Sequence, residues 1–496
     1  MNKFMPAIIL LLLLTLSFGC AAGKVGNDTP LERLKAEVDH LIADPAFASA
    51  SWGVYIEAPD TREVLYRHNE DKLLIPASNI KLFTTATALV RFGPNFTYKT
   101  RLYYDGTVSN GTLNGNLIVR GSGDPTISGR YNGNNITGTF QEWADSLKAM
   151  GIRKITGDVI GDDDYFDDVA MGYGWSWDDE PYYYSARISG LSFNDNTVKV
   201  RIKPGENVGD KAVIELDPPT KYVTIKNNIK TTLPDSTLYY DFSRSAAGNL
   251  FTFWGKYPIS KKAKTDWISV SNPTLYTATV VKETFESAGI TVGGKAKDGD
   301  DLKAKPNYDK LQSVAVYTSP PMSRMIRTVN KSSQNFYAEQ LLKTIGREYN
   351  HEGSASAGIK SVKSLLSGIG IDANGIKIVD GSGLSRMNLV STRQVATLLR
   401  YMRGHKYFDS YYDSLPIAGV DGSIGRRMRG TNAQRNMRAK TGYVSYVRSL
   451  SGYITTADGE DIIFSFIVNN YAVPTSMANE LQNRIGVILS NYSRGN

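Results

Sequence analysis

The stretch IPASNIKLF, residues 75–83, decides the fold because it combines the start of a buried helix with a serine and a lysine three positions apart. Pro76 suits the first turn of a helix. Apolar side chains then recur at helical spacing at Leu82, Phe83, Ala86, Leu89 and Val90. Because residues three apart share a helix face, we expect the Lys81 amine to reach the Ser78 hydroxyl.

Lys81 can serve as a base for Ser78 only if it is neutral part of the time. The ordinary pKa of lysine is about 10.4, so this needs a pKa lowered by about three units, or about 4 kcal/mol. Burial among apolar neighbours and a second nearby cation would lower it. The alternative is a solvated lysine on an ordinary helix.

We call Ser78-Asn79-Ile80-Lys81 the first string. The second string, Ser333-Gln334-Asn335, opens another apolar helix. In a functional site, Ser333 would pass a proton to a leaving amine, and Asn335 would hold the substrate backbone and the Lys81 side chain. Helix capping explains serines at such a place equally well, so this alternative stays open.

A third string, Lys440-Thr441-Gly442, precedes an apolar stretch at residues 446–454 that we expect to form the edge of a core sheet. Lys440 would keep Lys81 neutral by repulsion and attract a substrate carboxylate, and Thr441 would add a hydrogen bond. A surface turn before a strand is the alternative.

Together the three strings supply a nucleophile, a base, a second hydroxyl and a cation, which indicates acyl transfer without histidine. The four histidines stand in no Gly-x-Ser-x-Gly or metal-ligand setting. Residues 121–125 are glycine-rich but lack the Lys-Ser/Thr of a phosphate loop, and residues 161–168 lack the glycine and glutamate of a calcium loop. We therefore expect no metal and no cofactor.

The N-terminus has the layout of a secretory leader, with Lys3 followed by an apolar run over residues 6–16. We expect residues 1–22 to direct export to the periplasm. The single cysteine, Cys20, follows the apolar run and resembles a bacterial lipoprotein box, which predicts a lipid anchor. Simple cleavage after Ala22 is the alternative.

The catalytic strings are far apart, since residues 78 and 333 are separated by a stretch too long for a loop. Residues 100–310 alternate short strands with turn clusters and predict a β-rich insertion of two smaller domains. Residues 28–99 and 311–496 mix helices, among them 356–366 and 392–402, with strands, among them 52–57. We expect them to form one α/β domain whose sheet uses both ends of the chain.

The net charge of +8 is concentrated in a run with Arg426, Arg427 and Arg429. An exported protein rarely meets nucleic acid, so we expect no nucleic-acid partner. The run leads into Lys440, and a field that gathers substrates bearing carboxylates explains it better.

The chain resembles the class C low-molecular-mass penicillin-binding proteins, the D-alanyl-D-alanine carboxypeptidases and endopeptidases of the bacterial cell wall. Beyond the three strings, the resemblance rests on segments spread over nearly the whole mature chain. They are residues 174–179 (GWSWDD), 191–196 (LSFNDN), 337–339 (YAE), 380–386 (DGSGLSR) and 415–422 (LPIAGVDG).

This resemblance implies an α/β (α+β) penicillin-binding/β-lactamase-like serine transpeptidase domain split by two inserted, mainly β domains. It implies hydrolysis of peptidoglycan stem peptides through an acyl-enzyme on Ser78, with β-lactams as covalent inhibitors. The chain departs from the family pattern at Gln334, where Asp or Asn is usual, and at Tyr443, where Thr or Ser is usual. Tyr443 is expected to offer its backbone N–H to the oxyanion together with that of Ser78.

Three other functions remain open from the sequence. A β-lactamase would need fast deacylation, and we find no glutamate placed by a recognisable motif to drive it. An esterase with the same Ser-Lys pair would accept short acyl esters. A wall-binding protein with an idle site would show no acylation. The choice between carboxypeptidase and endopeptidase is open as well.

Overall fold

A five-stranded antiparallel sheet that joins the two ends of the chain organises the computed structural model, which describes residues 28–246 and 248–495. Its strands follow the order β18 (Arg438–Val444), β19 (Val447–Thr455), β20 (Asp461–Asn469), β1 (Ser51–Ala58) and β2 (Glu63–His68). The expected leader and Cys20 lie outside the described residues. None of the helices in the described ranges is both long and apolar enough to span a membrane.

The edge of this sheet differs from the expectation. Lys440 lies on its own strand, β18, which forms the edge, and the apolar stretch expected there is β19, one position further in. The short turn at residues 445–446 connects the two strands as a hairpin, so the third string pairs along its whole length with β19. The edge position leaves one side of β18 open toward the helices that carry the other two strings.

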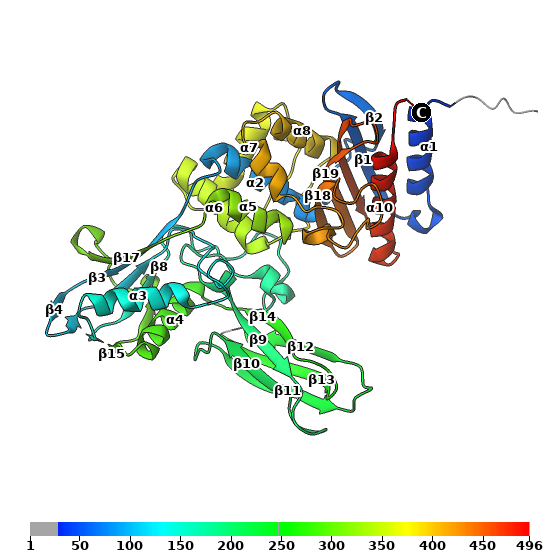
Figure 1. Ribbon diagram of the computed structural model, residues 1–496. Coiled ribbons are helices and arrows are strands. Elements are labelled where there is room, and N and C mark those ends of the chain that lie inside the picture. Colours follow the sequence, from blue (N-terminus) through cyan, green and yellow to red (C-terminus); the bar gives the residue numbers. More distant parts are fainter. Residues whose placement is uncertain (1–27, 247, 496) are drawn as a thin grey trace, which may run out of the picture.

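Helices cover both faces of the sheet (Figure 1). One face packs against α1 (Pro30–Ile42) and α10 (Thr475–Asn491), which come from opposite ends of the chain. On the other face, α8 (Thr392–Arg403) packs against the sheet. The same apolar cluster includes α2 (Ile80–Phe92), α5 (Met322–Lys331), α6 (Asn335–Asn350), α7 (Ala355–Gly368) and α9 (Phe408–Ser414). Two apolar cores therefore lie on either side of one sheet.

Helix α2 is buried along most of its length, as its apolar sequence predicts. The serine of the first string precedes it in a 3-10 turn, η2 (Ala77–Asn79), in which Ala77 has a φ of 47°. Strand β19 holds this turn in place, because the Ser449 hydroxyl donates to the Pro76 carbonyl at 2.7 Å and the Asn79 amide donates to Ser451 at 2.6 Å. The nucleophile candidate thus lies where helix and sheet meet.

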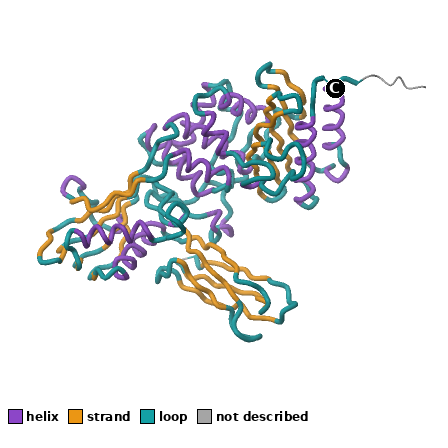
Figure 2. The backbone as a smooth tube through the Cα atoms, viewed as in Figure 1, coloured by secondary structure: helices purple, strands orange, loops and turns teal. Residues whose placement is uncertain are grey.

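The inserted region forms two arms that extend away from the helix-covered sheet (Figure 2). The first arm contains the sheets β16-β8-β6-β3-β17 and β15-β7-β5-β4. Its strands are β3 (Lys99–Tyr104), β4 (Thr107–Ser109), β5 (Thr112–Asn114), β6 (Leu117–Arg120), β7 (Lys154–Ile155), β8 (Val159–Asp162), β15 (Thr291–Val292), β16 (Ala296–Asp298) and β17 (Gln312–Thr318). Two helices that the sequence analysis did not identify, α3 (Gly138–Ala149) and α4 (Pro273–Ser287), pack against them.

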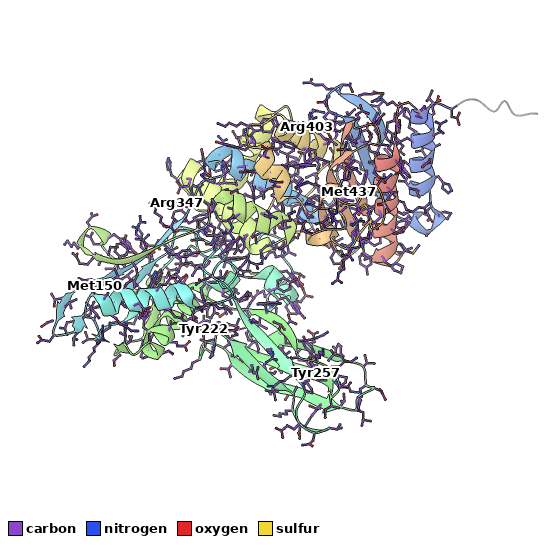
Figure 3. All side chains as sticks on the ribbon, in the orientation of Figure 1. Met150, Tyr222, Tyr257, Arg347, Arg403 and Met437 are labelled. Atoms are coloured by element: carbon purple, nitrogen blue, oxygen red, sulfur yellow. The ribbon has the colours of Figure 1, made fainter. Side chains whose placement is uncertain are left out.

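The second arm is nested within the first and contains two three-stranded sheets, β10-β9-β14 and β11-β13-β12. Its strands are β9 (Thr197–Lys203), β10 (Val213–Asp217), β11 (Thr224–Thr232), β12 (Tyr239–Arg244), β13 (Leu250–Pro258) and β14 (Lys264–Ser269). Figure 3 labels Met150 next to α3 in the first arm and Tyr257 in the second. One continuous apolar cluster connects both arms.

The end of the insertion lies further along the chain than residue 310. Strand β17 pairs antiparallel with β3, so it completes the sheet of the first arm rather than belonging to the helix-covered part. The sheet of the first arm therefore extends to Thr318, a few residues beyond the boundary expected at residue 311.

Candidate active site

The three strings converge around the amine of Lys81. Its Nζ atom donates to the Ser78 hydroxyl at 2.9 Å, to Asn335 Oδ1 at 2.6 Å and to the Ser382 carbonyl at 2.6 Å. The first contact joins residues three apart at the start of α2, as the helical spacing predicts. The second brings the first and second strings together. Once neutral, this amine is placed to accept the Ser78 proton.

Lys81 has no exposed surface, and burial lowers its pKa to about 7. Its neighbours Asp380 and Glu339 oppose this change by attracting the charged form. The lowered pKa of Lys81 therefore comes from desolvation. The expected repulsion between the two lysines lowers the pKa of Lys440 instead. Near neutral pH a substantial fraction of the Lys81 side chains can act as a base.

Lys440 is also fully buried and donates to the Ser333 hydroxyl at 2.8 Å and to the Thr441 carbonyl at 2.7 Å. Burial, followed by the charge of Lys81, holds the pKa of Lys440 well below its ordinary value. The second and third strings are thus connected by a direct hydrogen bond. A buried donor to Ser333 can supply the proton that a leaving amine requires.

Ser333 lies in the turn between α5 and α6 with a φ of 55°, in the left-handed region. Gln334, which immediately precedes the first residue of α6, forms no side-chain cap. Helix capping therefore does not account for Ser333, whose hydroxyl faces Lys440 instead. This strained position is consistent with a functional constraint.

Gly442 brings β18 directly against the nucleophile turn. A Cβ atom at this glycine would lie 3.1 Å from the Ser78 nitrogen and 2.6 Å from the Pro76 carbonyl oxygen. Only a residue without a side chain fits there, so the backbone of the third string passes beside the Ser78 N–H. The hydroxyl of Thr441 donates to Ser423 at 2.7 Å. Tyr443 follows with 55% of its surface exposed.

The loop at residues 380–386, which was not among the expected site residues, contacts the Lys81 amine through the Ser382 carbonyl. Glu339 accepts the N–H groups of Gly381 and Ser382, which places the Ser382 carbonyl on Lys81. Burial, with the nearby Asp380, raises the pKa of Glu339 to about 7. Both segments, residues 337–339 and 380–386, contributed to the family resemblance. The contact of the Ser382 carbonyl with Lys81 could not be predicted, because every residue type has a backbone carbonyl.

The inserted region contributes directly to the second string. The Asn335 amide donates to the Tyr184 carbonyl at 2.8 Å, and the Gln334 amide donates to Asp195 at 2.9 Å. The indole of Trp175 donates to Asp380 at 3.0 Å. Three segments of the insertion therefore contact the residues that surround Lys81.

The aspartates of residues 161–168 bind other parts of the protein. Asp163 accepts the Ser189 hydroxyl at 2.9 Å, and Asp164 pairs with Lys305 at 2.7 Å. Asp167 pairs with the buried Lys343. The first two contacts lie within the insertion, and Asp167 connects the insertion to α6.

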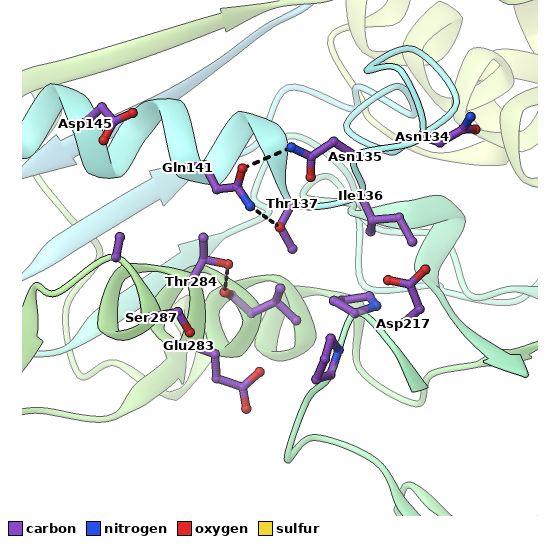
Figure 4. Close-up of a pocket in the computed structure, with 14 residues that line it drawn as sticks. Asn134, Asn135, Ile136, Thr137, Gln141, Asp145, Asp217, Glu283, Thr284 and Ser287 are labelled. Carbon is purple, nitrogen blue, oxygen red and sulfur yellow. Dashed lines mark hydrogen bonds between the residues drawn. The ribbon is translucent and has the colours of Figure 1, made fainter. Parts of the chain in front are cut away.

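A cavity of about 570 Å³ lies apart from this site, between α3, α4 and the loop that follows β10 (Figure 4). Asp145, Asp217 and Glu283 contribute carboxylates to its lining. Among the described residues that line it, none belongs to the three strings. The junction of β18, α2 and α6 is thus separate from this cavity.

Comparisons with known proteins agree with this geometry. The model of the D-Ala-D-Ala carboxypeptidase 3 (S13) family matches residues 34–492. A D-alanyl-D-alanine carboxypeptidase from Actinomadura sp. (strain R39) is 32% identical over 93% of this chain and 85% of its own length.

Solved structures show the same architecture. Penicillin binding protein 4 from Haemophilus influenzae superposes with a TM-score of 0.79 at 25% identity, over 92% of this chain and 99% of its own. The same protein complexed with a β-lactam superposes with a TM-score of 0.72 at 25% identity, over 92% and 100% of the two chains. The similarity includes the inserted arms as well as the sheet between its helix layers.

Proposed function

Because the chain belongs to the D-Ala-D-Ala carboxypeptidase 3 (S13) family, we propose that it hydrolyses peptides ending in D-Ala-D-Ala through an acyl-enzyme on Ser78. The observation that carries this proposal is the 2.9 Å contact between Ser78 and a fully buried Lys81 whose pKa is lowered to about 7. A hydroxyl next to such an amine is an activated nucleophile.

In the proposed mechanism, neutral Lys81 takes the Ser78 proton while the oxygen attacks the carbonyl of the penultimate D-alanine. The backbone N–H groups of Ser78 and Tyr443 receive the oxyanion, and each such donor contributes about 3–4 kcal/mol in comparable sites. Ser333 gives its proton to the departing D-alanine, and the proton that Lys81 took from Ser78 passes through Lys440 to Ser333, which leaves Lys81 neutral again. Water then releases the acyl group, with Lys81 again as base.

Asn335 has a positioning role in this scheme as well as a contact with substrate. Its side chain is almost buried, with the oxygen on Lys81 and the nitrogen on the Tyr184 carbonyl. These two contacts fix the amide orientation, so the Lys81 amine is held toward Ser78. We expect the same amide to border the substrate backbone.

The direct test is incubation of the chain, produced without its leader, with a fluorescent penicillin, followed by peptide mass mapping. A stable adduct on Ser78, together with D-alanine release from a D-Ala-D-Ala peptide, supports the proposal. Ser78→Ala should abolish both signals, and Ser332→Ala, which changes an exposed neighbouring serine, should abolish neither. An undiminished rate in Ser78→Ala contradicts the assignment.

The same experiment separates the other functions that the sequence leaves open. Rapid nitrocefin turnover without a lasting adduct indicates a β-lactamase, and cleavage of short esters alone indicates an esterase. A folded chain that is never acylated indicates a wall-binding protein.

Endopeptidase activity on cross-linked stem peptides is a second candidate. It attacks the same kind of D-alanyl carbonyl, and a larger amine leaves. Tyr184 and Asp195 from the insertion adjoin the second string, which places the insertion next to Ser333, the proposed donor to that amine. Comparing D-alanine release with cleavage of a purified cross-linked dimer distinguishes the two activities.

For location, we propose export to the periplasm and contact with the membrane only through a lipid on Cys20. The apolar run before the single cysteine supports this. Labelling with radioactive palmitate in the wild type, and its loss in Cys20→Ala, would test the anchor. An unlabelled wild-type protein that is still exported would support cleavage after Ala22.

A further inference from the structure

Arg448 lies beside the third string, and no carboxylate among the residues that the structure describes favours its charge. It is the cross-strand neighbour of Tyr443 in the β18–β19 hairpin, and its guanidinium carbon lies 4.0 Å from the centroid of the Tyr443 ring. Its Nε atom is buried and has no hydrogen-bond partner among the described residues. The described groups that favour its charge are two tyrosines, Tyr471 and Tyr443, rather than a carboxylate.

A second arginine increases the positive field at this place. The side chain of Arg427 donates to Asn483 Oδ1 at 2.7 Å and to the Asn479 carbonyl at 3.2 Å, both in α10. Burial and the charge of Arg448 lower the pKa of Arg427 to about 10, which Glu480 opposes only in part. Arg448 thus disfavours the charge of Arg427, and two arginines at one place attract an anion.

The lysine of the third string is closed to such an anion. Lys440 has no exposed surface, and its amine already contacts the Ser333 hydroxyl and the Thr441 carbonyl. The position after Lys-Thr-Gly carries Tyr443, whose aromatic side chain replaces the short hydroxyl usual there. A substrate carboxylate at this strand therefore needs another donor, and Arg448 is partly exposed.

The β18–β19 hairpin connects Arg448 with the turn that carries Ser78. Gly442 touches the Ser78 turn, Tyr443 is the next residue along β18, and Arg448 stands opposite it. We propose that Arg448, supported by the ring of Tyr443, binds the C-terminal carboxylate of the peptide substrate. This assignment rests on the proposed carboxypeptidase function and names a specificity residue for it.

The physical basis is the shape of the guanidinium group. Its planar fork can give a carboxylate two parallel hydrogen bonds, and an aromatic face under the plane limits its motion. Hydrogen bonds to charged groups contribute enough to change binding about tenfold or more. Recognition of the free carboxylate would restrict the enzyme to chain ends.

The test compares two peptides that end in D-Ala-D-Ala and differ only in a terminal carboxylate or carboxamide. We expect wild-type kcat/KM to favour the carboxylate at least about tenfold. Arg448→Gln should lower kcat/KM for the carboxylate peptide, so that the preference is lost, and should leave kcat/KM for the carboxamide peptide unchanged. Arg448→Lys should retain part of the preference. Arg426→Gln, which changes an exposed arginine next to Arg427, is the matched control and should keep the wild-type ratio.

A wild-type ratio in folded Arg448→Gln overturns the inference while leaving the proposed function intact. A wild type that cleaves neither peptide rejects the proposed function and this inference with it. If Arg448→Gln does not fold, Tyr443→Ala provides the second variant, because it removes the supporting ring and keeps the cation. Its preference should fall by a smaller factor, and an unchanged ratio there also overturns the inference.

Discussion

The side-chain amide of Gln334 donates to Asp195 at 2.9 Å, so the middle residue of the second string is bound to the inserted region. Asp195 lies in a loop where Asn194, Asp195 and Asn196 all have positive φ, and its carboxylate also pairs with Arg130 at 2.9 Å. Gln334 is one of the two departures from the family pattern. Its neighbour explains why an amide with a longer side chain is suitable there.

From this contact we expect Gln334→Asp to be harmful, although aspartate is usual at this position in the family. The new carboxylate would face Asp195, and the two like charges would repel each other. The turn that carries Ser333 should then shift, with kcat/KM lowered about tenfold. Steady-state kinetics on a D-Ala-D-Ala peptide measure this change.

Gln334→Asn is the matched control, since it keeps an amide and adds no charge. It should cost about 1 kcal/mol of stability or less. Equal activity of the two variants would show that repulsion from Asp195 plays no part.

The second prediction concerns pH. Burial lowers the pKa of Lys81 to about 7, and only the neutral amine can accept the Ser78 proton. The rate of acylation should therefore rise with pH through this range, about tenfold per pH unit below it, and level off above it. Stopped-flow measurement of penicillin acylation between pH 5.5 and 9 gives the profile. A rate that falls as the pH rises from 6 to 8 would contradict Lys81 as the base.

The third prediction removes the amine itself. Lys81→Met keeps a long apolar side chain in the buried position but supplies no base, so acylation should fall by about 10³-fold. Thermal unfolding should show a folded protein, because the change also removes a buried charge. Lys35→Met, at an exposed position of α1, is the control and should acylate at the wild-type rate. A labelled Lys81→Met variant would mean that another group activates Ser78.

The fourth prediction tests the close approach of β18 to the nucleophile turn. In Gly442→Ala the added methyl would lie 2.1 Å from Ser449 Oγ and 2.6 Å from the Pro76 carbonyl oxygen. The strand must move, which should cost about 1–3 kcal/mol of stability and lower kcat by at least about tenfold. Denaturant unfolding and kinetics measure the two effects.

Gly368→Ala makes a fair comparison, because a Cβ atom there would meet nothing within 4 Å. Its stability and activity should stay at wild-type values or rise slightly. If Gly442→Ala behaves in the same way, the contact between β18 and the Ser78 turn is not required.

Periodicity and motif spacing were sufficient for the outline of the helix-covered part. The helices expected around residues 356–366 and 392–402 are α7 and α8, and the strand expected at 52–57 is β1. The helical spacing from Ser78 to Lys81 also predicted a contact that the structure contains. Such features depend on local sequence, which a single chain displays directly.

Other features depend on tertiary pairing and were missed. Strand β17 resembles any short alternating segment, and only its pairing with β3 assigns it to the insertion. The place of β18 at the sheet edge follows from the hairpin with β19, which apolar content alone does not reveal. The carbonyl of Ser382 acts through the backbone, and every residue type carries that group.

The contacts from Tyr184 and Asp195 mean that the inserted arms cannot be treated as detachable modules. A shortened enzyme that joins residue 99 to residue 319 would leave the side-chain amides of Asn335 and Gln334 without their acceptors. It would also leave Asp380 without the indole of Trp175. The catalytic centre is therefore assembled from three distant stretches of sequence, and a minimal version of this hydrolase would need new acceptors designed into it before it could work.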